Sequence, residues 1–198
     1  MFWHFVFVST GILVGGGAKP AMSKCLEIFD EISMGCIQIF KFEENEFSKF
    51  AGQKTVEVVS RLSSIFDIKD QKKFFNDMML IAKDLYTTKL ETVPGVNNFL
   101  EKIVFKKFIG SNNILERIEL GLKNVGLDNY FQKESIFSFD LVGIPKPEPD
   151  IYLKAIESHK LNKLETIIIE DSSIGVQAGV KAGIKVIGLT AAGHWYKD

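Results

Sequence analysis

Two adjacent carboxylates, Glu170 and Asp171, end a run of β-branched residues in the segment TIIIEDSSIG, residues 166–175. The run predicts a buried strand, and two like charges at its end are costly unless a positive group lies beside them. Carboxylate oxygens are ligands that Mg²⁺ prefers in proteins. Glu170 and Asp171 are therefore candidate metal ligands. Taken alone, they fit equally well as the N-terminal cap of the following helix.

Polar residues also follow the other strands that the sequence predicts. These residues are Ser9 and Thr10 after the first strand, Ser111 and Asn112 after the second, and Lys146 shortly after the third. Each alone suits a surface residue or a helix cap. The carboxyl ends of parallel strands, however, meet at one edge of a sheet, where ligands bind.

A lysine and a hydroxyl there supply the charge and the directed hydrogen bonds that a phosphate group needs. Backbone N–H groups at the starts of helices after Ser111 and Ser172 would add further donors. The pattern predicts a site for a metal and a phosphorylated small molecule.

Strands and helices alternate along the second half of the chain, which predicts a parallel α/β sheet with helices on both faces. The continuous apolar run at residues 2–9 is typical of a central strand of such a sheet. From residue 93 onward we expect strands at 103–110, 137–142, 166–170 and 185–189, and helices at 95–102, 113–124, within 147–159, and at 174–182. The predicted fold is a Rossmann-like α/β core.

Residues 20–90 have a different pattern, with apolar residues at helical spacing and no convincing strand. We interpret this segment as a helical insert in the α/β core. The expected division is an α/β core from residues 1–18 and 91–198 and a helical cap from residues 19–90.

Composition narrows the classes of partner. The 198 residues carry 24 Lys and Arg against 25 Asp and Glu, a net charge of -1, which gives no electrostatic case for nucleic acid or an anionic membrane. The two cysteines, Cys25 and Cys36, suit buried thiols in a reducing compartment, so we expect a cytoplasmic protein. The apolar N-terminus lacks the basic region of a signal peptide and is too short to span a bilayer, so we expect no export and no membrane anchor.

Four segments resemble the haloacid dehalogenase (HAD) superfamily, in its branch of β-phosphoglucomutase-like and phosphoglycolate-phosphatase-like enzymes. They are PGVNNFLEKI (94–103), SNNILERIELGLKNVGLDNYF (111–131), KPEPDIYL (146–153) and IIIEDSSIGVQAGVKAGIKVIGL (167–189). The resemblance covers nearly the whole chain. It implies that the helical insert is a mobile cap that closes over the substrate.

The resemblance also implies roles for single residues. Ser111 would hydrogen-bond the transferring phosphoryl group, and Lys146 would neutralise that group and steady the nucleophile. Glu170 and Asp171 would help to hold Mg²⁺. Further residues implied in the site are Asn112 and the cap loop Gly52, Gln53 and Lys54 for substrate, and the backbone carbonyl of Thr10 for the metal.

The first motif departs from the family. In FVFVSTGILVGG, Val8 stands where the family has its nucleophilic Asp, and Thr10 stands where it has a second Asp that acts as acid and base. A valine side chain has no lone pair for attack and no oxygen for Mg²⁺. Loss of a catalytic nucleophile costs about 10⁶ in turnover, or roughly 8 kcal/mol of barrier. Ser9 and Thr10 have no evident general base, so we expect neither to replace the missing nucleophile.

Two functions remain open from the sequence. The first is a phosphatase or phosphomutase for a small phosphomonoester such as a sugar phosphate, with weakened Mg²⁺ binding and with catalysis impaired or lost. The second is a non-catalytic module that binds a phosphorylated metabolite or another protein. We expect a monomer or a weak homo-oligomer that associates through the sheet edge at residues 185–189.

Overall fold

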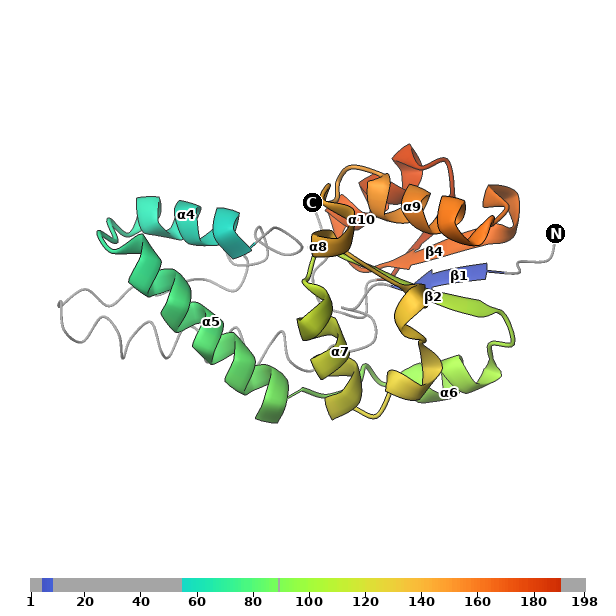
Figure 1. Ribbon diagram of the computed structural model, residues 1–198, viewed down its shortest axis with the longest axis horizontal. Coiled ribbons are helices and arrows are strands. Elements are labelled where there is room, and N and C mark those ends of the chain that lie inside the picture. Colours follow the sequence, from blue (N-terminus) through green and yellow to red (C-terminus); the bar gives the residue numbers. More distant parts are fainter. Residues whose placement is uncertain (1–4, 9–54, 89, 190–198) are drawn as a thin grey trace.

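The computed structural model describes residues 5–8, 55–88 and 90–189 (Figure 1). The strands are β1 (Phe5–Val8), β2 (Lys106–Ser111), β3 (Ile136–Ser138), β4 (Thr166–Glu170) and β5 (Lys185–Gly188). The helices are α4 (Thr55–Ile65), α5 (Gln71–Thr88), α6 (Val96–Lys102), α7 (Leu115–Asn124), α8 (Phe139–Val142), α9 (Asp150–His159) and α10 (Ser173–Lys181). Single turns of 3-10 helix lie at Asp128–Tyr130, Lys133–Ser135 and Lys163–Glu165.

The described strands form one parallel five-stranded sheet in the order β3-β2-β1-β4-β5. Strand β1 is central, as its continuous apolar run predicted. The chain moves outward from β1 in one direction through β2 and β3, and in the other through β4 and β5. Ligands of such sheets bind at the carboxyl ends of the strands where the strand order reverses, which is here between β1 and β4.

Helices cover both faces of the sheet, so the predicted α/β architecture is confirmed (Figure 1). Alternate residues of a strand point to opposite faces. In β2, Ile109 packs with the α6 and α7 side, whereas Phe108 packs with the α9 and α10 side. In β4, Ile168 lies in the core of the second face and is fully buried. These two cores hold the carboxyl ends of the strands at one fixed edge.

Helices α4 and α5 lie to one side of the sheet and share a small core of their own (Figure 1). That core consists of Val58, Val59, Leu62 and Phe74. Helix α5 also contacts α7, where the Arg117 guanidinium lies 3.1 Å from the sulfur of Met79. The described part of the insert is helical, in keeping with its sequence pattern. The division into a core and a cap with the stated boundaries stays a prediction.

One predicted element is wrong. Residues 137–142 were expected to form a strand, but β3 ends at Ser138 and α8 begins at Phe139. Gly143 ends this single helical turn with φ 87°, a left-handed conformation that glycine adopts easily, and its N–H donates to the Phe139 carbonyl at 2.7 Å. The Asp140 carboxylate accepts from the Leu115 N–H at 3.0 Å, which holds the turn against α7. The glycine that follows the sequence FDLV indicated the end of a helical turn. The apolar residues of this segment led instead to the prediction of a strand.

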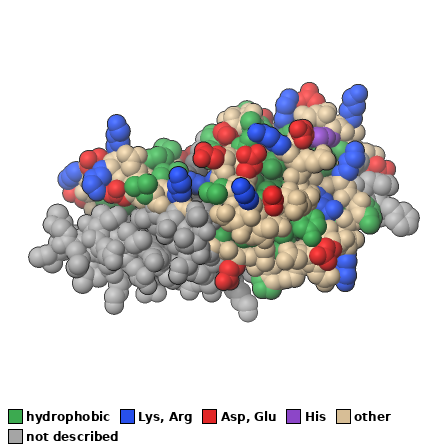
Figure 2. Space-filling view, turned by 60° about the horizontal axis from the view of Figure 1, so that its bottom comes forward, with side chains coloured by type: hydrophobic (Ala, Val, Ile, Leu, Met, Phe, Trp, Pro, Cys, Tyr) green, Lys and Arg blue, Asp and Glu red, His purple; other side chains and the backbone are tan. Residues whose placement is uncertain are grey.

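Acidic and basic side chains are interspersed over the described face in Figure 2, without a stripe of one sign. Within the described residues, no helix is long and apolar enough to cross a membrane.

Candidate active site

The strand register brings the predicted site residues to one edge. Val8, the last residue of β1, pairs with Ile109 of β2 and with Ile169 of β4. Ser111 therefore lies two residues beyond Val8 on one side, and Glu170 lies one residue beyond it on the other. Polar groups from two strands thus flank the end of the central strand, as the sequence predicted.

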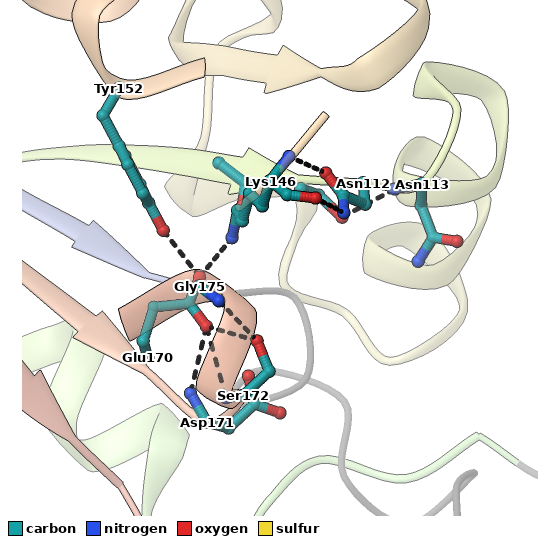
Figure 3. Close-up of polar contacts among 10 residues, drawn as sticks. Asn112, Asn113, Lys146, Tyr152, Glu170, Asp171, Ser172 and Gly175 are labelled. Carbon is teal, nitrogen blue, oxygen red and sulfur yellow. Dashed lines mark hydrogen bonds and ion pairs between the residues drawn. The ribbon is translucent and has the colours of Figure 1, made fainter. Parts of the chain in front are cut away.

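Lys146 and Glu170 form a buried ion pair at this edge (Figure 3). Their side chains are 4% and 0% exposed, and the Lys146 ammonium contacts Oε1 of Glu170. The same ammonium donates to the Gly110 carbonyl at 2.9 Å. A buried charge is tolerated when it is paired and hydrogen-bonded, and this lysine meets both conditions. Lys146 is therefore a buried residue at this edge of the sheet and not a surface lysine.

The second carboxylate oxygen of Glu170 faces the start of α10. Oε2 accepts from the backbone N–H of Asp171 at 3.2 Å, from the N–H of Ser172 at 3.4 Å and from the Ser172 hydroxyl at 3.1 Å (Figure 3). The helix cap itself is Ser172, whose hydroxyl oxygen accepts from the Gly175 N–H at 3.2 Å. Neither Glu170 nor Asp171 is the N-cap residue, so the alternative reading of this pair as the helix cap is wrong.

Tyr152 also contacts Glu170 at this edge, and it was not among the residues predicted from the sequence. Its hydroxyl donates to Oε1 of Glu170 at 2.6 Å, and its ring is buried beneath the Lys146 ammonium. Burial, followed by the nearby Glu170 carboxylate, raises the pKa of Tyr152 well above its ordinary value of 10.0. The phenol thus stays protonated and donates at neutral pH. A tyrosine in an otherwise apolar helix face could have indicated this contact, because a buried hydroxyl needs a hydrogen-bond partner.

Gly175 is the residue that lets α10 approach Glu170. A Cβ atom at position 175 would overlap the Glu170 carboxyl group, whose two oxygens are already held by neighbouring donors. The glycine is therefore required by the site and not by helix formation.

We expect Gly175→Ala to destabilise the protein by about 1–3 kcal/mol, the usual cost of overpacking. Helix propensity alone predicts the opposite sign, since alanine is favoured over glycine by about 1 kcal/mol. The free energy of unfolding from urea titration measures the difference. Gln177→Ala, at an exposed position of the same helix, is the control. A Gly175→Ala protein as stable as the parent would contradict the close approach.

Ser111 is the last residue of β2 and Asn112 follows it, and neither caps α7. That helix begins at Leu115 with Ile114 as its N-cap residue, so its first N–H groups lie further from Ser111 than we expected. The buried Ser111 hydroxyl oxygen accepts from the Asn113 N–H at 3.1 Å. The Asn112 side chain is turned to the backbone of Lys146 (Figure 3). Ser138, buried at the end of β3, pairs in register with Ser111.

The described residues fit a Mg²⁺ site only in part. Both oxygens of Glu170 are engaged by donors, so direct coordination by Glu170 requires the loss of one or more of those contacts. Asp171 is a buried carboxylate at the same edge. No group of three or more His, Cys, Asp or Glu residues suited to a metal occurs in the described part of the chain. The roles of Glu170 and Asp171 as metal ligands stay predictions.

Several predicted site residues lie outside the described residues. They are Thr10, with its backbone carbonyl, and the loop residues Gly52, Gln53 and Lys54. Their roles in acid-base chemistry, metal binding and substrate contact stay predictions.

A family model described as haloacid dehalogenase-like hydrolase matches residues 24–189. The chain is 27% identical over 153 residues to the bifunctional riboflavin kinase/FMN phosphatase of Arabidopsis thaliana, across 75% of this chain and 40% of that protein. It is 24% identical over 153 residues to 6-phosphogluconate phosphatase of Escherichia coli, across 76% of this chain and 68% of that protein. The match thus spans less than half of the first relative and about two thirds of the second.

The fold is shared with solved structures. A haloacid dehalogenase-like protein of Agrobacterium tumefaciens has a TM-score of 0.79 at 22% identity, covering 98% of this chain and 86% of that chain. A candidate β-phosphoglucomutase of Thermotoga maritima has a TM-score of 0.73 at 22% identity, covering 93% and 84%.

Proposed function

The chain belongs to the haloacid dehalogenase-like hydrolase family, as its motifs predicted, and from this membership we propose that it binds a small phosphomonoester, such as a sugar phosphate, with catalytic turnover impaired by Val8. The relatives named above include phosphatases, one of them for 6-phosphogluconate. Their names support a phosphorylated small molecule as the ligand class.

The observation that carries this proposal is the position of Val8. It ends the central strand, in register with Ile109 and Ile169, and polar residues follow on both neighbouring strands. This is the place from which a nucleophile would reach a phosphoryl group held by Ser111 and Lys146. A valine there cannot form an acyl phosphate, because its side chain has no nucleophilic oxygen.

The remaining residues retain the means to bind a phosphoryl group. In this proposal the Ser111 hydroxyl donates to a phosphoryl oxygen, and the Lys146 ammonium supplies positive charge beside it. Glu170 and Tyr152 hold Lys146 in place. Glu170, Asp171 and the Thr10 carbonyl are the ligands that we propose for a Mg²⁺ ion, which would neutralise phosphoryl charge. Because Val8 offers no carboxylate, we expect this binding to be weak.

A second candidate is a binding module without turnover, which the same Val8 position favours. In either case we propose a cytoplasmic protein whose partner is a phosphorylated metabolite and neither a nucleic acid nor a membrane. Association of copies, if it occurs, would be weak and would use the outer edge of β5, where Ile187 is 44% exposed.

We expect inorganic phosphate or glucose 6-phosphate to raise the melting temperature of the parent protein. A ligand at about ten times its Kd adds about 1.4 kcal/mol to the free energy of unfolding, roughly 3–6 °C for a chain of this size. Glucose and sodium chloride at equal ionic strength should give no shift. Phosphate release, measured in parallel, separates the impaired enzyme from the pure binding module.

Ser111→Ala should remove most of that shift, because the phosphoryl group loses a hydroxyl donor. Ser64→Ala, an exposed serine on α4, is the matched control and should leave the shift unchanged. A parent protein that neither shifts with phosphate esters nor releases phosphate would overturn the proposed function.

A further inference from the structure

Lys146 lies in the loop between α8 and α9, where none of the described strands pairs with its backbone. Its neighbours in this loop are mostly exposed or half-buried, yet Lys146 is buried and its ammonium reaches Glu170. Other groups must therefore hold the Lys146 backbone, since a free loop would let this long side chain turn to water.

The Asn112 side chain supplies such a contact (Figure 3). Its Oδ1 accepts from the Lys146 N–H at 2.8 Å, and its Nδ2 donates to the Lys146 carbonyl at 3.1 Å. A side-chain amide has one acceptor and a donor group, like a peptide group. The Asn112 side chain thus makes the two backbone hydrogen bonds that a neighbouring strand would make with Lys146.

Three consecutive residues at the end of β2 hold Lys146 or lie beside it. The Gly110 carbonyl accepts from the Lys146 ammonium at 2.9 Å, and the Asn112 amide binds the Lys146 backbone. Ser111 lies between them in the chain. The hydroxyl and the ammonium that we assign to phosphate are therefore attached to one short stretch of backbone.

We propose that Asn112 is a positioning residue, which fixes Lys146 relative to Ser111, and that it is not a substrate contact. Only the predicted effect of Asn112 on phosphate affinity rests on the proposed function. The Oδ1 and Nδ2 atoms of Asn112 both contact the backbone of Lys146, so the loop and not a substrate sets the orientation of this amide. Fixed spacing of hydroxyl and ammonium favours one tetrahedral anion of phosphate size.

Neighbouring Asn113 offers a matched control. Its side-chain oxygen lies 3.4 Å from the Arg117 guanidinium, and only its backbone N–H contacts Ser111. Asn113→Ala therefore removes an amide of the same size, one residue away, and leaves both contacts between Asn112 and Lys146 in place.

The first readout is acetylation of Lys146 by sulfo-N-hydroxysuccinimide acetate, followed by mass spectrometry. In Asn112→Ala we expect Lys146 to react about tenfold faster than in the parent, the factor that loss of the two hydrogen bonds gives. Asn112→Asp keeps the acceptor and should give an intermediate rate. Asn113→Ala should match the parent. Equal Lys146 rates in Asn112→Ala and the parent would overturn the proposal.

General destabilisation is tested with Leu122→Ala, which removes a buried side chain from α7. If Lys146 reacts as fast in Leu122→Ala as in Asn112→Ala at 20 °C, the effect is global unfolding and the proposal fails. Slow reaction in Leu122→Ala, at an equal or lower melting temperature, supports local positioning.

The second readout is the affinity for inorganic phosphate by calorimetry. Positioning predicts that affinity falls about three- to tenfold in Asn112→Ala together with faster acetylation of Lys146. A direct substrate contact predicts the loss of affinity with unchanged acetylation, which would overturn the proposal. If the parent does not bind phosphate, the proposed function fails, and the acetylation rates still decide the role of Asn112.

Discussion

Val8→Asp is expected to raise the rate of phosphate release from p-nitrophenyl phosphate by about 10²–10⁴ over the parent protein. Restoring a nucleophile can return up to about 10⁶ in turnover. An acid-base group is worth about 10²–10⁴, and the second Asp of the motif remains Thr10 in this variant. The gain should therefore be partial. Val8→Asp/Thr10→Asp should add a further factor of about 10²–10⁴.

Val8→Asn is the matched control, because the amide has the shape of aspartate but neither its charge nor its nucleophilic oxygen. It should remain as inactive as the parent. All variants are compared by circular dichroism, since a polar group at the end of a central strand can affect folding. Turnover by the unaltered chain at the level of Val8→Asp would show that Val8 does not occupy the nucleophile position. Inactivity of a folded Val8→Asp/Thr10→Asp protein would favour the binding module.

The sequence was sufficient for the fold because its signals were local and repeated. Strand β4 was predicted with the bounds that it has, since an apolar β-branched run ends abruptly at charged residues. Gly183, with φ 70°, lies directly after the predicted end of α10, where a left-handed glycine is usual. Strand β2 begins at Lys106, three residues later than expected, because apolar residues 103–105 belong to the preceding connection.

The site was less predictable than the fold, because the contacts of its side chains join residues far apart in the chain. The position of Glu170 at a strand end could be predicted, but not that five donors surround its carboxylate. Asn112 followed a strand, as expected of a ligand-binding residue, yet its amide faces the loop 34 residues later. Such contacts depend on tertiary packing, and the spacing of residues within one segment does not predict them.

The Lys146–Glu170 pair also bears on why the site persists without an acid at position 8. Lys146 is neutralised by Glu170 from within the fold, so its burial does not depend on a carboxylate from β1. Under the proposed function, loss of the nucleophile would remove chemistry without leaving a buried, unpaired lysine. Folding and catalysis would then depend on different residues, which is compatible with a valine at position 8.

Glu170→Ala is expected to lower the free energy of unfolding by about 3–5 kcal/mol, which is the cost of leaving one member of a buried ion pair without its partner. The Lys146 ammonium would keep its contact with the Gly110 carbonyl, and the Tyr152 hydroxyl would lose its contact with Glu170. Urea titration at pH 7, followed by circular dichroism, measures the loss.

Glu148→Ala is the control, because it breaks the Glu148–Lys181 pair, whose side chains are 52% and 44% exposed. Exposed pairs contribute about 0–1 kcal/mol, so the two variants should differ several-fold. Lys146→Met/Glu170→Gln should lose less than the sum of Lys146→Met and Glu170→Gln, since no unpaired charge remains in the double variant. Additive losses, or a Glu170→Ala protein no less stable than Glu148→Ala, would mean that water reaches this pair and that Glu170 does not fix Lys146. The charge that we assign to phosphate binding would then be mobile, and the site would have to be organised by the ligand and not by the fold.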